Sequence, residues 1–162
     1  MKTLLIMRHA KSSWKDASMD DRARPLSKRG EKDAPRMGKH LSDRHLVPEI
    51  ILTSPAKRTL DTAQLVAEKS GFQGEIRQLE SLYMGEPQAY LEELARLDNN
   101  YNTVLVIGHN PGLESLLQIL ADTMESLPTA SVAVVELPVD DWADVNASLR
   151  GKLVKIWKPK DL

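Results

Sequence analysis

The sequence predicts an α/β protein built around a mostly parallel sheet. Short apolar runs without polar alternation are typical of parallel strands that are buried on both faces. Such runs occur at residues 3–7, 50–52 and 103–107, and between them lie segments with apolar residues every three to four positions. Strands that alternate with helices in this way favour a three-layer α/β/α sandwich.

The pair Arg8 and His9 directly follows the apolar run at residues 3–7. In an open α/β sheet, ligands bind beyond the carboxyl ends of the strands, so a residue just past a buried strand is held at the ligand site. Arginine offers a planar set of donors suited to phosphate oxygens, and a neutral histidine nitrogen can attack an electrophile. The pair therefore predicts phosphoryl chemistry at this edge of the sheet.

The next segment is long and polar. Residues 11–24 show no helical or strand periodicity, which predicts a surface loop that begins at the proposed site. The following helix is expected to have Ser27 as its N-cap residue. Pro35 lies inside the apolar pattern of that helix, and we expect it to kink or split the helix.

A second strand end carries another arginine. Ser54 and Pro55 follow the run at residues 50–52 and predict a helix with Ser54 as N-cap and Pro55 as its first residue. Gly71 is expected to end this helix. Arg58 then lies in the first turn, beside backbone N–H groups that favour an anion.

The strongest strand signal, at residues 103–107, leads to a second histidine. His109 follows this run, and Asn110 and Pro111 are the predicted cap and start of the next helix. A histidine therefore again stands between a buried strand and a helix N-terminus. The remaining expected elements are strands at residues 75–79, 132–137 and 153–157, a loop at residues 80–85 and a helix begun by Pro87 and ended by residues 98–100.

Length and composition limit the class of protein. With 162 residues, the chain is expected to form a single domain over residues 1–162. Lys and Arg number 22 against 23 Asp and Glu, without long runs of like charge, so no nucleic-acid or membrane partner is expected. Cysteine is absent, which excludes disulfides and thiolate metal sites. The first apolar run is too short for a signal peptide or membrane span, and we expect a cytoplasmic protein.

Four reactive residues stand at three strand ends: Arg8, His9, Arg58 and His109. A single histidine beside a strand is more often a structural residue, but two histidines and two arginines at equivalent places favour one common site. A metal site is the competing use of the two histidines. The neighbouring arginines would repel a divalent cation, so we expect neither metal nor cofactor. The other two histidines are interpreted as structural or solvent-facing: His40 and His45.

The motifs together resemble the histidine phosphatase superfamily, and the small size and the Arg-Pro-Leu-Ser segment are most similar to the SixA-type phosphohistidine phosphatases. The motifs are Arg8-His9, Arg24-Pro25-Leu26-Ser27 with Gly30, Ser54-Pro55-Ala56-Lys57-Arg58-Thr59, and Gly108-His109. The resemblance spans nearly the whole chain and implies a phosphoglycerate-mutase-like fold. It also implies that His9 is the nucleophile that accepts the phosphoryl group. Arg8 and Arg58 would bind its oxygens, His109 would donate a hydrogen bond to it, and water would hydrolyse the phosphohistidine intermediate.

The chain departs from the family's sequence pattern at two places, the residue after Arg-His and the general acid. Ala10 stands where much of the superfamily has glycine, and Glu80 stands near the place of the carboxylate that phosphomonoesterase branches use. Glu80 is either a general acid or an ordinary surface residue, and Glu86 is a poorer candidate. A phosphohistidine substrate needs a dedicated acid less, because the leaving imidazole titrates near pH 6.5. Four loop residues either border the pocket or are solvated: Lys11, Ser12, Ser13 and Arg24.

Three functions fit these residues. The first is a phosphatase that acts on phosphohistidine in a protein and releases inorganic phosphate. The second is a phosphatase of the same superfamily that hydrolyses a small phosphomonoester. The third is a regulatory module that binds phosphate without turnover.

Overall fold

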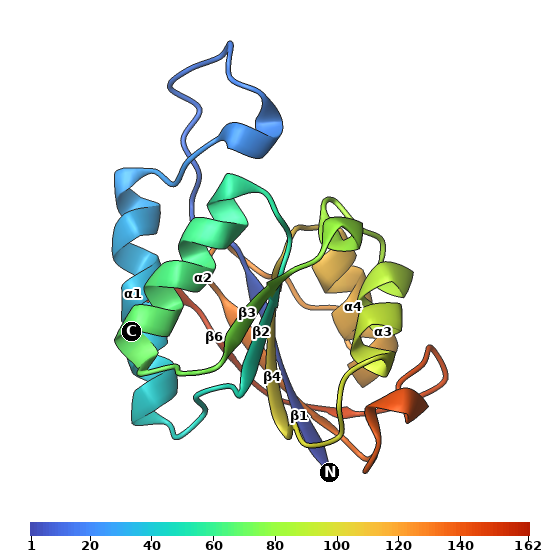
Figure 1. Cartoon of the computed structure of the whole chain (residues 1–162). Helices are drawn as coiled ribbons and strands as arrows, with labels where there is room; N and C mark the ends of the chain where they lie inside the picture. The colour runs from blue at the N-terminus through green and yellow to red at the C-terminus, as the bar shows by residue number, and fades with distance from the viewer.

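A six-stranded sheet forms the middle of the structure, a computed structural model that describes all 162 residues (Figure 1). The strands are β1 (Lys2–Arg8), β2 (Ile50–Thr53), β3 (Glu75–Gln78), β4 (Thr103–Gly108), β5 (Val132–Leu137) and β6 (Lys152–Trp157). Their order in the sheet is β3-β2-β4-β1-β5-β6. The first four in this order run parallel, β5 is antiparallel to β1, and β6 is antiparallel to β5. The predicted mostly parallel sheet is confirmed, with β5 as its reversed strand.

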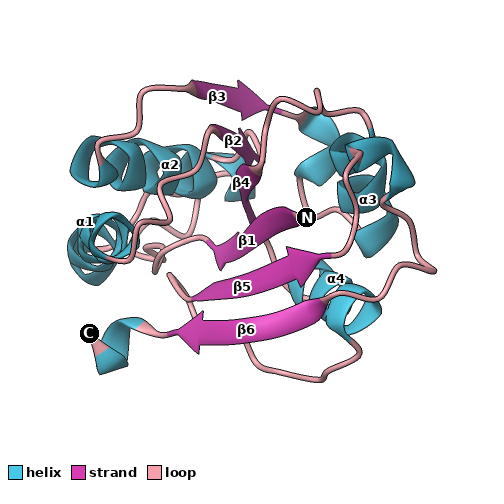
Figure 2. Cartoon of the chain, turned by 90° about the horizontal axis from the view of Figure 1, so that it is seen from below, coloured by secondary structure: helices cyan, strands magenta, loops and turns pink.

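Helices cover both faces of the sheet. Seen from below in Figure 2, α1 (Lys28–Asp43) and α2 (Lys57–Ser70) lie on one side, and α3 (Pro87–Ala95) and α4 (Gly112–Ala121) lie on the other. The predicted three-layer α/β/α sandwich is therefore confirmed. None of these helices is both long enough and apolar enough to cross a membrane.

The two faces of β1 pack into separate cores. Leu4 and Ile6 belong to the core beneath α3 and α4, whereas Leu5 and Met7 belong to the core beneath α1 and α2. Side chains alternate along a strand, so a strand covered on both faces must be apolar at every position. The uninterrupted apolar run thus reflects burial on both faces.

Helix α1 runs through Pro35 without a break, so the expected splitting of the helix does not occur. The N-cap prediction is confirmed, because the Ser27 hydroxyl accepts a hydrogen bond from the backbone N–H of Gly30 at 3.2 Å. A proline inside a helix costs about 3 kcal/mol. Ala34 and Met37 are buried on either side of Pro35, and their packing holds the two halves of α1 together.

Gly38 lies where α1 and α2 approach closely, and it offers a test of this packing. A Cβ atom at Gly38 would lie 2.7 Å from the backbone oxygen of Val66, so the helices would have to move apart. We expect Gly38→Ala to lower the free energy of unfolding by about 1–3 kcal/mol, although alanine favours helices more than glycine does. Urea unfolding would measure the change. Lys39→Ala, on the exposed side of the same turn, is the control, and an unchanged or raised stability of Gly38→Ala would contradict the close contact.

Several predicted helix ends are displaced. Helix α2 begins at Lys57 rather than at Pro55, and Ala56, not Ser54, is its N-cap residue. Helix α4 begins at Gly112, after Pro111 as N-cap residue. Helix α3 begins at Pro87 as predicted but ends at Ala95, before residues 98–100. The predicted end of α2 at Gly71 is confirmed, with a left-handed backbone conformation at φ 77°.

Candidate active site

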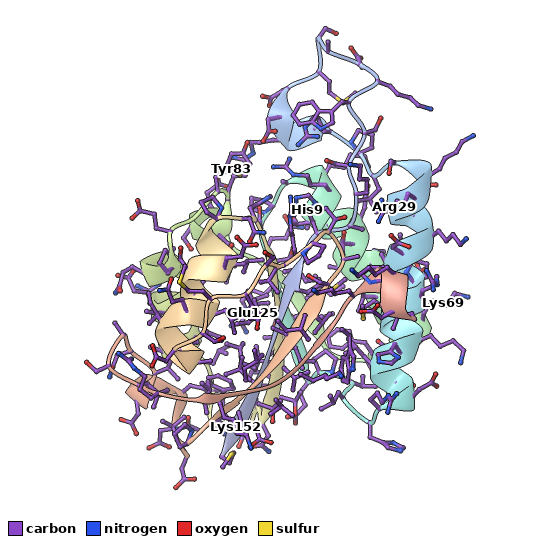
Figure 3. All side chains as sticks on the ribbon, turned by 180° about the vertical axis from the view of Figure 1, so that it is seen from behind. His9, Arg29, Lys69, Tyr83, Glu125 and Lys152 are labelled. Atoms are coloured by element: carbon purple, nitrogen blue, oxygen red, sulfur yellow. The ribbon has the colours of Figure 1, made fainter.

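Three adjacent strands end at one edge of the sheet and define the site. Arg8 of β1 pairs with Gly108 of β4, and Thr53 of β2 pairs with Ile107 of β4. The segments that follow these strands therefore leave the sheet together. They surround a cavity of about 330 Å³ that four predicted residues line: Arg8, His9, Arg58 and His109. Figure 3 shows His9 at the end of β1, below the loop that contains a short 3-10 helix, η1 (Asp21–Ala23).

His9 is buried and held in one tautomer. Its Nδ1 lies 2.7 Å from the carbonyl oxygen of Ala10. A carbonyl oxygen only accepts, so Nδ1 carries the proton and Nε2 keeps its lone pair in the neutral ring. Burial is the main cause that lowers the pKa of His9 to about 4, and the nearby positive charges of Arg58 and Arg8 add to it. The ring is therefore neutral at pH 7, with Nε2 available as a nucleophile.

His109 lies beside His9, with 5.5 Å between the ring centroids. Its Nδ1 is 3.3 Å from Nη2 of Arg58, and its Nε2 is 2.7 Å from the hydroxyl of Ser54. A guanidinium only donates, so in this arrangement Nδ1 accepts and Nε2–H donates to Ser54. Because the hydroxyl of Ser54 can also donate, it can support the other tautomer, in which Nδ1–H points to a bound anion. Ser54 thus orients a histidine of the site instead of capping α2.

The pKa of His109 is lowered to about 3, first by burial and then by the charge of Arg58. In the unfolded chain both histidines titrate near 6.5, so between pH 6.5 and 4 the unfolded state binds more protons than the folded state. We expect the free energy of unfolding to fall as the pH falls through this window. NMR titration of the imidazoles should show His9 and His109 still neutral at pH 5.5, and a midpoint near 6.5 for either ring would contradict their burial.

The two predicted arginines keep donors unused by the protein. Arg58 is only 2% exposed, and its Nε has no hydrogen-bond partner. It lies in the first turn of α2, as predicted. Arg8 donates from Nη1 to the carbonyl of Leu127 at 3.2 Å, while its Nε is also buried without a partner. Guanidinium groups with buried, unpaired donors favour an anionic ligand.

Arg24 adds a third guanidinium group to the lining of the cavity. It is buried and lines the cavity, with Nη1 2.7 Å from the hydroxyl of Ser12. Lys11 and Ser12 line the cavity too, whereas Ser13 does not and bonds through its backbone to Pro25. Of the four loop residues whose position was open, three therefore border the pocket.

Asp21 is a carboxylate of the site that sequence reasoning missed. It lines the cavity, and its Oδ2 accepts from the hydroxyl of Tyr83 at 2.5 Å and from Nη2 of Arg58 at 3.1 Å. These contacts lower the pKa of Asp21 to about 2, with the Tyr83 hydroxyl as the largest cause. The available signal was weak: an acidic residue in the loop, three positions before Arg24.

Glu80 is not brought into the cavity. Its side chain is 71% exposed and makes two hydrogen bonds to the guanidinium of Arg22 on the surface. These bonds hold the pKa of Glu80 below its usual range. Glu86 is exposed and does not line the cavity either. Of the two alternatives for Glu80, the geometry favours the surface residue.

No group of three or more His, Cys, Asp or Glu side chains is placed to hold a metal ion. The two histidines of the cavity instead face guanidinium groups of Arg8, Arg24 and Arg58. The donor set of the cavity therefore suits a tetrahedral oxyanion better than a cation.

Comparison with known proteins agrees with this fold. The family model of the histidine phosphatase superfamily (branch 1) matches residues 4–83. A chloroplastic, uncharacterized protein of Arabidopsis thaliana is 31% identical over 153 residues, which cover 89% of this chain and 70% of the relative. The chain therefore belongs to the histidine phosphatase superfamily, and it is a phosphatase with the phosphoglycerate-mutase-like fold that its motifs imply.

Within the superfamily, the structure is similar to the SixA proteins. One of these, from Nakamurella multipartitia and assigned as a phosphohistidine phosphatase, matches with a TM-score of 0.87 and 25% identity over 98% of this chain and 96% of the other. A protein histidine phosphatase SixA complexed with tungstate matches with a TM-score of 0.84 and 26% identity over 98% of both chains. The expected resemblance to SixA-type phosphatases is confirmed.

Proposed function

We propose that this phosphatase hydrolyses phosphohistidine in a protein, by transfer of the phosphoryl group first to His9 and then to water. The observation that carries the proposal is the state of His9. Its Nε2 is unprotonated, because Nδ1 donates to Ala10, and it shares one cavity with the guanidinium groups of Arg8 and Arg58. A neutral nucleophile beside fixed positive charge is the arrangement that phosphoryl transfer needs.

The first step forms a bond between Nε2 of His9 and phosphorus while the bond from phosphorus to the leaving nitrogen breaks. The N–H groups of Arg8 and Arg58 bind the phosphoryl oxygens and compensate the charge that spreads over them. His109, in the tautomer with Nδ1 protonated, donates a further hydrogen bond. In the second step, water attacks phosphorus, the bond to Nε2 breaks, and inorganic phosphate leaves with neutral His9 restored.

The acid–base state of the site favours a nitrogen leaving group. Asp21, the one carboxylate that lines the cavity, has a pKa of about 2 and carries no proton near neutral pH. An alcohol phosphate would release an alkoxide and would need a proton donor. A phosphohistidine ring that carries a proton on its other nitrogen, which titrates near pH 6.5, leaves as neutral imidazole, so it needs such a donor much less. This difference supports phosphohistidine over a small phosphomonoester, and the guanidinium groups support a reaction that needs no metal.

A substrate panel tests the proposal. The purified protein would be given a histidine-phosphorylated protein, a serine-phosphorylated peptide and a sugar phosphate, each with and without EDTA. We expect phosphate release from the phosphohistidine protein alone or by far fastest, and equal rates in EDTA. Preference for the sugar phosphate together with loss of activity in Glu80→Gln would instead support the phosphomonoesterase. Phosphate binding without turnover of any substrate would support a regulatory module.

A further inference from the structure

A large aromatic side chain lies exposed at the rim of the cavity. Trp14, in the loop over residues 11–24, is 71% exposed and lines the cavity together with His9 and Arg58. The other two tryptophans differ, since Trp142 is fully buried and Trp157 is half-buried. Only one other apolar side chain, that of Met84, lines this polar cavity. The indole therefore offers an apolar flat surface next to the phosphoryl site.

One face of the indole rests on a fixed support. The guanidinium carbon of Arg24 lies 3.5 Å from the centroid of the Trp14 ring. Arg24 is itself only 6% exposed and is held by Ser12 at 2.7 Å and by Asp21 at 3.2 Å. This cation–π contact orients the ring. Because Trp14 is 71% exposed, most of its surface outside this contact is accessible to a ligand.

We propose that Trp14 is a specificity-determining residue, whose open face stacks on the flat ring that carries the phosphoryl group. The inference rests on the proposed function, and the ring is then the imidazole of phosphohistidine. The phosphoryl end binds Arg8 and Arg58, while the ring lies against the indole at the rim. Stacked aromatic rings gain free energy beyond the burial of their area, whereas an aliphatic carrier gains little from such a surface.

The size of the cavity agrees with this assignment. Its volume of about 330 Å³ is at the lower end of the range for small-molecule sites. This space accommodates a phosphoryl group and one ring more readily than a nucleotide. A histidine side chain places its ring directly on the phosphoryl group, so the ring must lie within the cavity or at its rim.

The competing role of Trp14 is structural. The indole covers Arg24, so its loss could disturb the positive charge of the cavity and weaken every substrate alike. The two roles differ in their dependence on the leaving group. A structural role predicts equal losses for substrates with and without a ring, and a stacking role predicts a loss only for substrates with a ring.

The test compares phosphohistidine with phosphoramidate, which has the same phosphorus–nitrogen bond but releases ammonia. We expect Trp14→Ala to lower kcat/KM for phosphohistidine about tenfold, mainly through a higher KM, and to leave phosphoramidate nearly unchanged. Trp14→Phe should restore most of the activity, because it keeps a flat ring. Met19→Ala is the matched control, since Met19 is exposed on the same loop but does not line the cavity.

Any other outcome would overturn the inference, and the results show whether the proposed function fails with it. Equal losses for both substrates would assign Trp14 to the support of Arg24 and overturn the stacking role, while the proposed function would stand. Unchanged activity of Trp14→Ala on phosphohistidine would also overturn it. Failure of the wild-type protein to hydrolyse either substrate would remove the proposed function and the inference together.

Discussion

Replacement of His9 by alanine should abolish turnover, with kcat lower by about four orders of magnitude or more. The reason is chemical: the variant lacks the nitrogen to which the phosphoryl group is transferred, and no other neutral imidazole nitrogen in the cavity has the same freedom. Both nitrogens of His109 are engaged, by Arg58 and by Ser54. Steady-state phosphate release from a phosphohistidine substrate measures the effect.

Two controls separate the loss of a nucleophile from the loss of the fold. His45 is exposed and lies outside the cavity, so His45→Ala should keep wild-type activity. Added imidazole should enter the space left in His9→Ala and restore part of the turnover. A His9→Ala variant that keeps more than about a tenth of the wild-type rate would contradict nucleophilic catalysis by this residue.

Replacement of Arg58 by alanine has the second largest expected effect, a loss of about 10²–10³ in kcat/KM. Arg58 lines the cavity and contacts His109 and Asp21, and its Nε is buried without a hydrogen-bond partner. Without Arg58, the charge on the phosphoryl oxygens is less well compensated and Asp21 loses its buried partner. Arg58→Lys should recover only part of the loss, because a single ammonium group cannot bind two oxygens as a guanidinium does.

Calorimetric titration with phosphate or tungstate would accompany the kinetics of the Arg58 variants. Oxyanion affinity should fall with activity if Arg58 binds the phosphoryl group. Arg22→Ala serves as the matched control, since Arg22 pairs with Glu80 on the surface and does not line the cavity. Wild-type affinity in Arg58→Ala, or an equal loss in Arg22→Ala, would assign the effect to general charge or to folding.

The sequence predicted the fold well where burial on both faces dictates composition. The runs that became β1, β2 and β4 are apolar at nearly every position because helices cover both sides of the sheet. The parallel pairing of these strands then places the residues after them at one edge. The sequence alone therefore groups His9, Arg58 and His109 at one site.

Side chains that meet through a loop could not be predicted in this way. Asp21 reaches Arg58 and Tyr83 only because the loop folds back over the end of the sheet. The local sequence pattern does not predict the course of this loop. Trp14 on Arg24 is a contact of the same kind. Glu80 follows β3, the edge strand of the sheet, and its side chain pairs with Arg22 outside the cavity.

Local sequence signals for helix starts and breaks also failed where tertiary contacts outweighed the local preference of a residue. Ser54 has the composition of an N-cap residue, but its hydroxyl bonds His109, so α2 begins after it. Asn110 similarly directs its side-chain amide to Glu114 and Leu127 instead of capping α4. At Pro35, packing against α2 outweighs the local preference for a break.

The most direct test of the account is to locate the phosphoryl group on the enzyme during turnover. The reaction would be stopped rapidly in alkali, which preserves phosphohistidine, and the phosphorylated peptide would be identified by mass spectrometry and its nitrogen by NMR. We predict a phosphoryl group on Nε2 of His9, because Nδ1 is occupied by its hydrogen bond to Ala10. A phosphoryl group on His109, or on Nδ1 of His9, would contradict the account.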